Sequence, residues 1–488
     1  MRNLKRVLSL VMAVAMLIGL MVVSASAAST YDDFTDKDEI VNKEAVNTMV
    51  SLGVINGKED GSYFAPADIV TRAEMAKLIA VCLYGGKDPL LGTGAVTTQF
   101  SDVSSTYWAA PYIAYCANLG IINGKGDGTF GPEEPVTGTA AAKMFLCALG
   151  YRSDIEGLTG SGWDLNTDTL ANKVGLYDDM NITPSNGLSR DNTAQLIYNG
   201  VQADEVEYRN NYGEYSGVIY AQPINGTGAN AEPSTLLYTR FNVVKVEGVV
   251  VANDIMDIDD QGTTVSGKTR LTDIYVGGVH RVETVNNQEK LLSETYPVAM
   301  DNSYLGQRVV LYVKGLKNLA PNAASTQVVS EPILSEDNTV ATTATRMKDT
   351  DAVRSFLSDN GLTLPDNVTD TATNGTVSYT RNATDLNTGI PTRAFAADST
   401  PNVNGTEFTF IDHNGDGVVD YIFKTLPQLA KVTVYNETDK ELTIAGEGSI
   451  DFDDIANPED VAKDDIVLYY LVNETYYLTK AETISGEV

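Results

Sequence analysis

Two arginines stand where a helix start would bind an anion. Arg72 directly follows Thr71 and Arg190 directly follows Ser189, and threonine and serine both cap helix starts. The helix dipole disfavours a cation at this first position by roughly 0.3–1 kcal/mol. An arginine that occurs there twice therefore indicates a functional role. An arginine beside free N–H groups suits a carboxylate. We therefore predict that Thr71, Arg72 and Arg190 bind an anionic ligand, the alternative being a surface Arg72 paired with Glu74.

A second motif places oxygen ligands at alternate positions. Residues 412–420 read D-H-N-G-D-G-V-V-D, with glycine at position six, a pattern that suits a hard cation such as Ca²⁺. Position twelve is Phe423, so the bidentate glutamate of a helical EF-hand is missing, and the flanking residues indicate strands. The motif predicts a structural calcium ion held by five residues, namely Asp412, Asn414, Asp416, Val418 and Asp420.

Neither acidic stretch needs to bind a metal ion. Residues 412–420 could form a solvated Asp/Gly hairpin without metal. A second acidic cluster has poorer ligand spacing and predicts a solvated turn; it contains Asp254, Asp257, Asp259 and Asp260.

The arginines belong to a repeated unit. Residues 52–58 read L-G-V-I-N-G-K and residues 119–125 read L-G-I-I-N-G-K. An F-x-D triplet lies ahead of each copy, and an F-x-P triplet followed by a threonine lies behind it. Each unit therefore predicts a helix, a Gly-rich loop and a second helix. A looser third copy runs from Trp163 to Val201 and contains S-R-D at 189–191.

The second helix of the first unit has a clear apolar stripe and a start signal. Thr71 and Glu74 form a T-x-x-E capping box. The stripe consists of Met75, Leu78, Ile79 and Cys82, spaced i, i+3, i+4 and i+7. The three cysteines, Cys82, Cys116 and Cys147, lie at apolar positions and predict buried thiols, with a reactive thiol as the alternative.

These residues resemble the S-layer homology (SLH) module. Residues 70–74 read V-T-R-A-E, which is nearly the full signature of its second helix. The second unit carries Y-W-A at 107–109 and G-D-G-T-F-G-P at 126–132, but reads V-T-G-T-A at 136–140 and has lost the arginine. The third unit has lost the D-G-T-F-x-P stretch. The resemblance covers about residues 30–203.

The resemblance implies a fold and a partner. SLH modules come in threes, form a compact three-pronged helical domain, and hold secondary cell-wall polysaccharide, often with pyruvyl ketals, in the grooves between prongs. A ketal pyruvate carries a carboxylate for Arg72 and Arg190. Trp108 would stack on a sugar ring, or be a partly buried core residue. Asp36 and Asp102 would bind sugar hydroxyls, or cap the first helix of each unit.

The composition sets the fold class. The 488 residues include 65 acids and 34 bases, a net charge of −31, which argues against a nucleic-acid binder. From residue 204 the chain is rich in Val, Thr, Tyr, Asn and Asp, and two stretches read as related β modules. We expect an N-terminal all-α SLH domain of three units and a β-rich C-terminal region of small barrels or sandwiches.

The expected domains follow from these composition changes. The first 27 residues have a basic start, an apolar run and a small-residue cleavage site, which predict a secretory signal peptide rather than a membrane anchor. No later stretch is apolar enough for a span, so the mature protein is expected to have none. The boundaries are 1–27 (signal), 30–90, 96–152 and 153–203 (SLH units one to three, the third degenerate), 204–330 (first β module), 331–428 (mixed module with the calcium-type loop) and 429–488 (second β module).

The sequence thus predicts a secreted, wall-anchored structural protein of the surface-layer type, with self-assembly into a lattice as a further expectation. The catalytic motifs G-x-S-x-G, G-x-G-x-x-G and H-E-x-x-H and the P-loop are missing, and the chain has only two histidines. A wall-anchored enzyme acting on polysaccharide or peptide, and an adhesin, are the alternatives.

Overall fold

The structure is a computed structural model of the chain, and it falls into two compact units. One extends to Val244 and includes Tyr312–Gly315 and Val329–Glu331; the other holds the rest. The predicted signal peptide lies outside the described residues. These are residues 30–481 without 59–60, 90–94, 211–218, 227–231, 255–256, 260, 286–287, 322–324, 344–349, 365–367, 374–375, 382–406, 426–427, 456–457 and 473–474.

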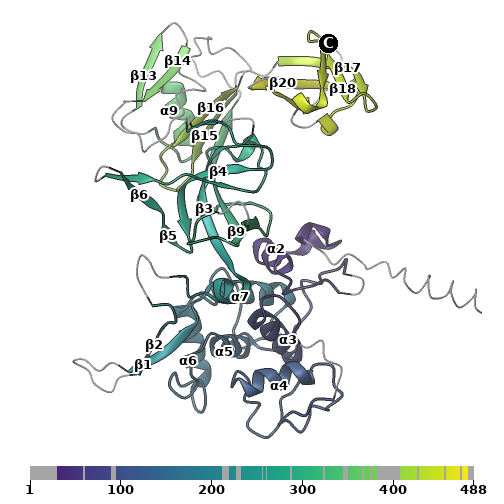
Figure 1. Cartoon of the computed structure of the whole chain (residues 1–488), viewed down its shortest axis with the longest axis vertical. Coiled ribbons are helices and arrows are strands. Elements are labelled where there is room, and N and C mark those ends of the chain that lie inside the picture. Colours follow the sequence, from purple (N-terminus) through teal and green to yellow (C-terminus); the bar gives the residue numbers. More distant parts are fainter. Residues whose placement is uncertain are drawn as a thin grey trace, which may run out of the picture. The chain divides into compact units, whose positions relative to one another are not determined.

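Three helix pairs lie between Lys43 and Gln202 (Figure 1). The second helix of each pair packs on the first helix of the next, so α3 lies on α4, α5 on α6, and α7 on α2. This cyclic order agrees with the three predicted units. The helices are α2 (Lys43–Ser51), α3 (Arg72–Leu83), α4 (Ala110–Asn118), α5 (Gly138–Ala148), α6 (Trp163–Lys173) and α7 (Arg190–Gln202), with the short 3₁₀ helices η1 (Tyr31–Asp33) and η2 (Lys37–Glu39) ahead of them.

Each second helix begins at a side-chain cap. Thr71 and Glu74 form the predicted capping box, and Ser189 accepts the N–H of Asn192 as expected. Thr137 caps α5 in the same way, although the residue after it is Gly138 instead of arginine. The cap is therefore retained in all three units, whereas the arginine is not.

A closed ring of three backbone hydrogen bonds joins the units. Val70 N–H donates to the Leu188 carbonyl, Leu188 N–H to the Val136 carbonyl, and Val136 N–H to the Val70 carbonyl, each at 2.9 Å. All three residues are buried. They occupy the same place in their units, directly before the caps, so each unit contributes one donor and one acceptor to the ring.

The aspartates of the F-x-D triplets tie each Gly-rich loop to its unit. Asp36 accepts the N–H groups of Phe64 and Ala65 at 2.9 and 2.7 Å. Asp102 does the same for Phe130 and Gly131 at 2.8 and 2.7 Å. The two carboxylates therefore shape the F-x-P loops, and Asp36 is itself buried.

Residues 204–244 contribute β1 (Val206–Asn210), β2 (Ile219–Pro223) and α8 (Leu236–Phe241). A seven-stranded sheet follows in the order β10-β9-β3-β4-β5, with β11 on β9 and β8 on β4. Its strands are β3 (Val243–Ala252), β4 (Thr269–Val276), β5 (Val279–His280), β8 (Glu294–Tyr296), β9 (Arg308–Lys314), β10 (Gln327–Val328) and β11 (Ile333–Leu334); β6 (Val282–Val285) and β7 (Gln288–Leu291) form a hairpin, and η3 (Asn302–Tyr304) precedes β9.

The remaining strands form a sheet in the order β12-β15-β16, a β13-β14 hairpin, and a five-stranded sheet in the order β19-β18-β17-β20-β21. Helix α9 packs on β15, because its Val353 and Leu357 lie in one core cluster with Phe408 and Phe410. The elements are β12 (Thr339–Thr343), α9 (Thr350–Asp359), β13 (Val368–Thr373), β14 (Thr376–Arg381), β15 (Glu407–Asp412), β16 (Tyr421–Thr425), β17 (Gln428–Asn436), β18 (Glu441–Ile444), β19 (Ser449–Asp451), η4 (Phe452–Asp454), η5 (Pro458–Asp460), β20 (Ile466–Val472) and β21 (Thr475–Lys480).

The first and last β modules share a local construction. In both, a strand valine exchanges two backbone hydrogen bonds with the two residues ahead of a later strand: Val250 with Gly306 and Gln307, and Val432 with Asp464 and Asp465. Gly306 and Asp464 both adopt positive φ, at 77° and 74°. The β-rich character is confirmed. Neither sheet closes on itself within the described strands, so the small barrel stays a prediction.

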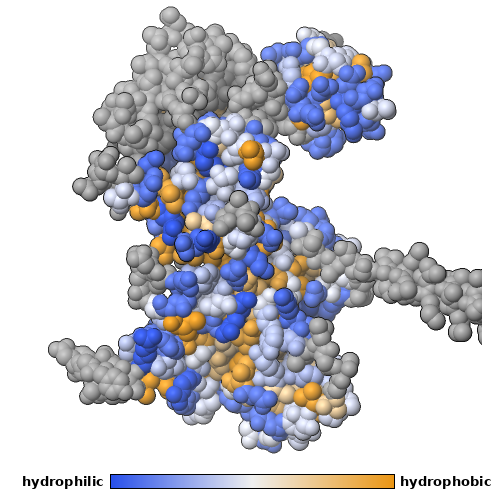
Figure 2. Space-filling view, viewed as in Figure 1, coloured by the Kyte–Doolittle hydropathy of each residue, from blue (hydrophilic) through white to orange (hydrophobic). Residues whose placement is uncertain are grey.

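The visible face of the described surface is mainly hydrophilic, with small apolar areas between (Figure 2). Within the described residues, no helix combines the length and the apolar character needed to cross a membrane.

Replacing Asp36 by alanine should lower the unfolding free energy of the helical domain by about 2–4 kcal/mol, because two N–H groups lose a charged acceptor. Both tryptophans, Trp108 and Trp163, lie in this domain, so urea unfolding followed by tryptophan fluorescence reports on it alone. Asp32→Ala is the control, because Asp32 makes an exposed ion pair with Lys37, and exposed ion pairs contribute little to stability. Equal effects of the two substitutions would contradict the assigned role of Asp36.

Candidate functional site

Arg72 lies over an aromatic ring of the next unit. Its guanidinium is 4.7 Å from the centre of the Phe130 ring, and its Nε donates to the Phe130 carbonyl at 2.8 Å. Arg190 repeats this geometry on Phe64, at 5.0 Å from the ring centre and with a 2.8 Å hydrogen bond to the carbonyl. Each arginine therefore reaches from a helix start onto the F-x-P loop of another unit.

Neither arginine makes an ion pair with a described residue. Glu74 caps Thr71 through a 2.7 Å bond from the Thr71 N–H, so it does not pair with Arg72. The terminal nitrogens of Arg72 make no hydrogen bond within the described part of the chain, whereas Nη2 of Arg190 donates to the Asn56 carbonyl at 3.1 Å. Burial lowers the pKa of both guanidinium groups. Arg72 thus has more hydrogen-bonding capacity left for a ligand.

Aromatic side chains gather around the start of α4, the helix that packs against α3. Trp108 is 50% exposed, and its ring centre lies 5.7 Å from that of Tyr107 and 6.4 Å from that of Tyr112. The Tyr107 hydroxyl donates to Glu133 at 2.5 Å, and burial together with the Glu133 charge raises the pKa of Tyr107 to about 12. Trp108 is therefore accessible, as sugar stacking requires.

The predicted residues divide between two places. Thr71 and Arg72 lie at the start of α3, where the charges of Glu134 and Asp102 act on Arg72. Partial burial would raise the pKa of Asp102, but the N–H groups of Phe130 and Gly131 outweigh it and hold the pKa below its usual value. Arg190 lies at the equivalent start of α7, where the charges of Glu74, Asp68 and Asp36 act on it.

The sequence interpretation missed the aromatic platforms. Phe64 and Phe130 belong to the F-x-P triplets and were read only as repeat markers. Phe64 follows Asp36, and Phe130 follows Asp102, by the same number of residues. This spacing is the sequence signal for the contact, because each aspartate accepts the N–H of the phenylalanine in its own unit. The pairing of each phenylalanine with an arginine of a different unit follows from the cyclic closure of the domain, which spacing alone does not reveal.

The cysteines are separate from this site. Cys82 and Cys116 are buried and Cys147 is half-buried, in agreement with the prediction of packed thiols. Burial raises the pKa of Cys82, Cys116 and Cys147, which keeps the thiols protonated at neutral pH.

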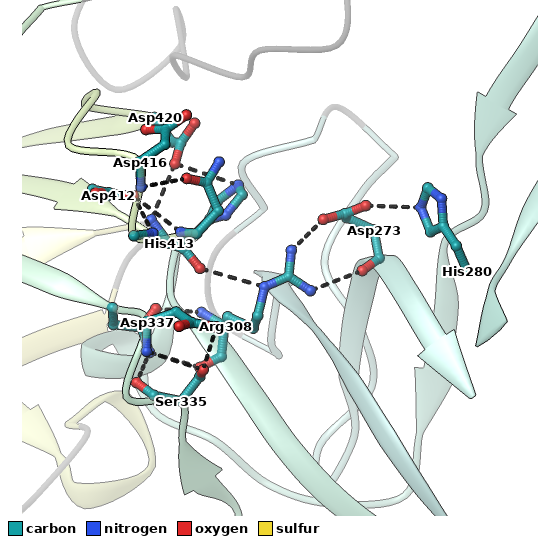
Figure 3. A network of polar contacts seen from close by, with 12 residues as sticks. Asp273, His280, Arg308, Ser335, Asp337, Asp412, His413, Asp416 and Asp420 are labelled. Atoms are coloured by element: carbon teal, nitrogen blue, oxygen red, sulfur yellow. Dashed lines mark hydrogen bonds and ion pairs between the residues drawn. The ribbon is translucent and has the colours of Figure 1, made fainter. Parts of the chain in front are cut away.

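The loop of residues 412–420 joins β15 to β16, the two strands predicted to flank it. The Asp412 carboxylate is 1% exposed and accepts the N–H groups of Asn414 and Gly415 on one oxygen and of Gly417 on the other, at 2.8–3.0 Å. Asn414 and Asp416 each accept the N–H two residues further on. The loop is thus wound around Asp412 (Figure 3).

Asp420 closes the loop. It accepts the His413 N–H at 3.0 Å, and the His413 Nε2 lies 3.6 Å from its carboxylate. Burial raises the pKa of Asp420, and the charges of Asp412 and Asp416 add to this effect. The carbonyl of Val418 takes no hydrogen bond from a described residue, whereas Gly417 on its N-terminal side binds Thr363.

The loop meets the requirements for a cation only in part. Within the described residues, no group of three or more His, Cys, Asp or Glu side chains is arranged to hold a metal ion. The backbone is nevertheless turned as the pattern requires, with Gly415 and Gly417 at φ 74° and 80°. The calcium ion stays a prediction.

A buried arginine links the loop to the neighbouring sheet. Arg308 donates from Nε to the His413 carbonyl at 3.3 Å and pairs with Asp273, which also contacts His280 at 2.9 Å (Figure 3). Sequence analysis missed this contact, because Arg308 is 105 residues away from the loop.

The second acidic cluster is not a solvated turn, and that prediction is wrong for two of its members. Asp257 and Asp259 are largely buried, and both pair with Arg270. Asp254 is exposed and Asp260 lies outside the described residues. The two carboxylates share the one guanidinium of Arg270. At Asp259 the effect of burial outweighs that of Arg270 and raises the pKa to about 6.

The family comparison identifies the helical domain. A family model described as "S-layer homology domain" matches residues 33–76 and 99–142. These two segments are S-layer homology domains. Each match includes an F-x-D aspartate and, in the first, Arg72. The third copy lies outside the matched residues, in line with its loss of the D-G-T-F-x-P stretch.

Similar proteins come from the surfaces of several bacteria. A "Cell surface protein" of Thermoanaerobacter kivui is 25% identical over 54% of this chain and 32% of its own length. A "Surface layer protein" of Brevibacillus choshinensis is 29% identical over 32% of this chain and 13% of its own length. An "Uncharacterized cell wall amidase" of Bacillus anthracis is 28% identical over 32% of this chain and 28% of its own length.

The chain therefore matches no more than about a third of the length of these relatives. The SLH domains and the surface-layer relatives indicate a secreted protein on the cell-wall surface.

Replacing Asp259 by asparagine should change how stability depends on pH. A carboxyl whose folded pKa is raised stabilises the fold fully below its unfolded value of about 4, and this stabilisation is lost as the pH rises through about 6. The pKa of Asp257 is lowered instead, so its stabilisation is lost only below about pH 4. Wild type should therefore lose about 1–3 kcal/mol more than Asp259→Asn between pH 4.5 and 7.5.

Hydrogen exchange of the β4 amides, next to Arg270, measures this difference in the full chain. Asp254→Asn is the control, since Asp254 is exposed and should leave the pH profile unchanged. Parallel profiles for wild type and Asp259→Asn would contradict the raised pKa.

Proposed function

We propose that the SLH domains anchor the protein noncovalently to secondary cell-wall polysaccharide and that the whole chain is a structural component of the surface layer. The observation that supports anchoring is the half-buried Arg72, whose guanidinium lies over the Phe130 ring and makes no ion pair with a described residue, together with the half-exposed Trp108 just ahead of the adjacent helix α4. A half-buried guanidinium whose terminal nitrogens have no described hydrogen-bond partner is suited to a ligand carboxylate.

The chemistry follows from the atoms that remain available. The terminal nitrogens of Arg72 would donate to a carboxylate such as that of a pyruvyl ketal. The indole of Trp108 would offer an apolar face to a sugar ring. Asp102 uses its carboxylate for two loop N–H groups but still has lone pairs that accept from sugar hydroxyls. Arg190 would form a weaker second site, because part of its guanidinium already binds Asn56.

Arg72→Ala should weaken sedimentation of the full chain with purified wall polysaccharide by about 10–100-fold in Kd, which corresponds to one charge-assisted contact. Arg190→Ala should have a smaller effect, and Arg72→Lys should keep part of the affinity. Arg152→Ala is the control, because Arg152 lies in the same domain but pairs with the exposed Asp154.

Two results would disprove anchoring by these residues. One is an Arg72→Ala variant that sediments like wild type. The other is full wall binding by a chain without residues 30–203. Chemical removal of the pyruvyl groups from the polymer distinguishes the carboxylate from the sugar, because wild type should then bind no better than Arg72→Ala.

The second candidate function, a wall-anchored enzyme, is favoured only by the relative with "amidase" in its name. Surface-layer relatives support the structural role instead. Electron microscopy of the purified full chain tests this role: ordered arrays support it, while cleavage of cell-wall material by the same preparation would favour the enzyme.

We further propose that residues 412–420 bind Ca²⁺ through Asp412, Asn414, Asp416, Asp420 and the Val418 carbonyl. The support is the alternate oxygen spacing and the backbone wound by Gly415 and Gly417. The ion would neutralise charges crowded within one turn and would stiffen the junction of β15 and β16, with no part in catalysis.

Calcium should slow hydrogen exchange in the loop and its two strands. With an extracellular-type Kd of roughly 10⁻⁴–10⁻³ M, about 10 mM Ca²⁺ would stabilise the bound state by about 1–3 kcal/mol. Asp416→Ala should abolish the effect at little cost to the fold, because Asp416 is exposed and accepts one hydrogen bond. Asp439→Ala, in an exposed turn elsewhere, is the control.

The calcium proposal fails if exchange of residues 407–425 is unchanged at about 10 mM Ca²⁺, well above that Kd range, or if Asp416→Ala responds like wild type.

A further inference from the structure

Two loops of the helical domain contain an Asn-Gly pair whose reactive groups are not hydrogen-bonded. The pairs are Asn56-Gly57 and Asn123-Gly124, within the L-G-x-I-N-G-K segments of the first two units. Both asparagines are exposed and lie outside helices and strands. Neither side-chain amide hydrogen-bonds to a described residue, and neither does the N–H of the glycine that follows it. The amide carbon and the glycine nitrogen of each pair are therefore free to react.

An asparagine followed by glycine is chemically labile in water, because glycine has no side chain to hinder attack by its own backbone nitrogen. That nitrogen attacks the side-chain carbon Cγ, a cyclic succinimide forms, and ammonia leaves with the proton of the glycine N–H. Water then opens the ring at either carbonyl and gives aspartate or isoaspartate, so the net reaction consumes one water and releases one ammonia. Hydrogen bonds to the amide or to the glycine N–H slow the attack, because they must break first.

The fold requires glycine at the second position of both pairs. A Cβ on Gly57 would lie 2.1 Å from the carbonyl oxygen of Gly61. A Cβ on Gly124 would lie 2.6 Å from the ring of Phe100, and Gly124 also adopts a φ of 72°. The loop geometry thus demands the very residue that makes the preceding asparagine labile.

The other Asn-Gly pairs provide an internal comparison. The sequence contains nine such pairs, and seven of them lie within the described residues. At Asn225 and Asn360 the amide donates to a backbone carbonyl at 2.8 Å, and the following glycine N–H also has a carbonyl acceptor. Asn199 lies inside α7, and its amide donates to two carbonyls. The Asn414 side chain accepts a backbone N–H, and the next glycine donates to the Asp412 carboxylate.

Asn186 is the closest comparison, because its amide also has no described partner but its main chain is fixed. The Asn186 N–H donates to the Thr183 carbonyl at 2.9 Å, and the Asn186 carbonyl accepts the Gly138 N–H at 3.1 Å. Two residues further on, Leu188 belongs to the hydrogen-bonded ring. Succinimide closure requires the main chain at the asparagine to rotate, and these hydrogen bonds oppose that rotation.

We propose that Asn56 and Asn123 are sites of spontaneous modification, at which the folded chain deamidates to aspartate and isoaspartate while the other five described pairs are protected. Each conversion adds a carboxyl group that is ionised at neutral pH, and therefore one negative charge, to the helical domain. The reaction needs only solvent water, so this proposal goes beyond the proposed function and does not depend on it.

The conversion at Asn56 also changes a contact between units. Nη2 of Arg190 donates to the Asn56 carbonyl at 3.1 Å. Isoaspartate lengthens the main chain by one carbon, which moves this carbonyl away from the guanidinium, whereas aspartate places a new carboxylate in the same loop. Asn56 is therefore the pair at which the modification alters how the third unit is joined to the first.

Peptide mapping by mass spectrometry tests the proposal on the full chain, incubated in mildly alkaline buffer while circular dichroism confirms the fold. Asn56 and Asn123 should be the first of the seven described asparagines to convert. The other five should convert at least about tenfold more slowly, which corresponds to about 1.4 kcal/mol of local opening free energy. Asn56→Gln and Asn123→Gln should each remove the conversion at their own position and leave the other unchanged.

Incubation in urea is the matched control, because all seven pairs have the same dipeptide sequence and the unfolded chain exposes them alike. Their rates should then become similar. The proposal is overturned if Asn56 and Asn123 convert no faster than Asn225 and Asn360 in the folded chain, or if the order of conversion is the same with and without urea. Rapid conversion at only one of the two sites overturns it for the other.

Discussion

The helical domain depends on the ring of hydrogen bonds among Val70, Val136 and Leu188. Three short segments, distant in sequence, each donate one hydrogen bond and accept one. No backbone N–H or carbonyl group of the ring is therefore buried without a partner. The capping residues follow directly, so the ring also sets where α3, α5 and α7 begin. Each helix start is thereby brought to the F-x-P loop of another unit, as the 2.9 Å hydrogen bond from the Arg72 N–H to the Glu134 carbonyl illustrates.

The arginines serve the fold and the site through one contact. Stacking on Phe130 and the bond to its carbonyl use the Nε edge of Arg72 and join two units. The opposite edge of the guanidinium is not needed for this contact, so in the proposed function the same arginine both joins two units and receives a ligand carboxylate. Structural contacts use more of the Arg190 guanidinium, because its Nη2 donates a further hydrogen bond to the Asn56 carbonyl. Where Gly138 replaces the arginine, its N–H still reaches the Asn186 carbonyl, so the backbone joint persists without the cation.

Local signals predicted the local structure. The T-x-x-E box of Thr71 and the strands on either side of residues 412–420 depend on neighbours in sequence, and both are present. Contacts between distant residues were not predictable. Arg270 turns Asp257 and Asp259 from a solvated turn into a buried ion-pair network, and nothing within the acidic cluster itself points to that partner. The same holds for Phe130 under Arg72, because a helix start does not specify which loop will face it.

Repetition within one chain permits a comparison that a single copy would not. Lys77 and Lys143 share a helix position and both lie over an aromatic ring, yet within the described residues only Lys77 has a carboxylate at ion-pair distance. The cation–aromatic contact therefore joins the helices of adjacent units in both places, and it persists where no described carboxylate takes part in it.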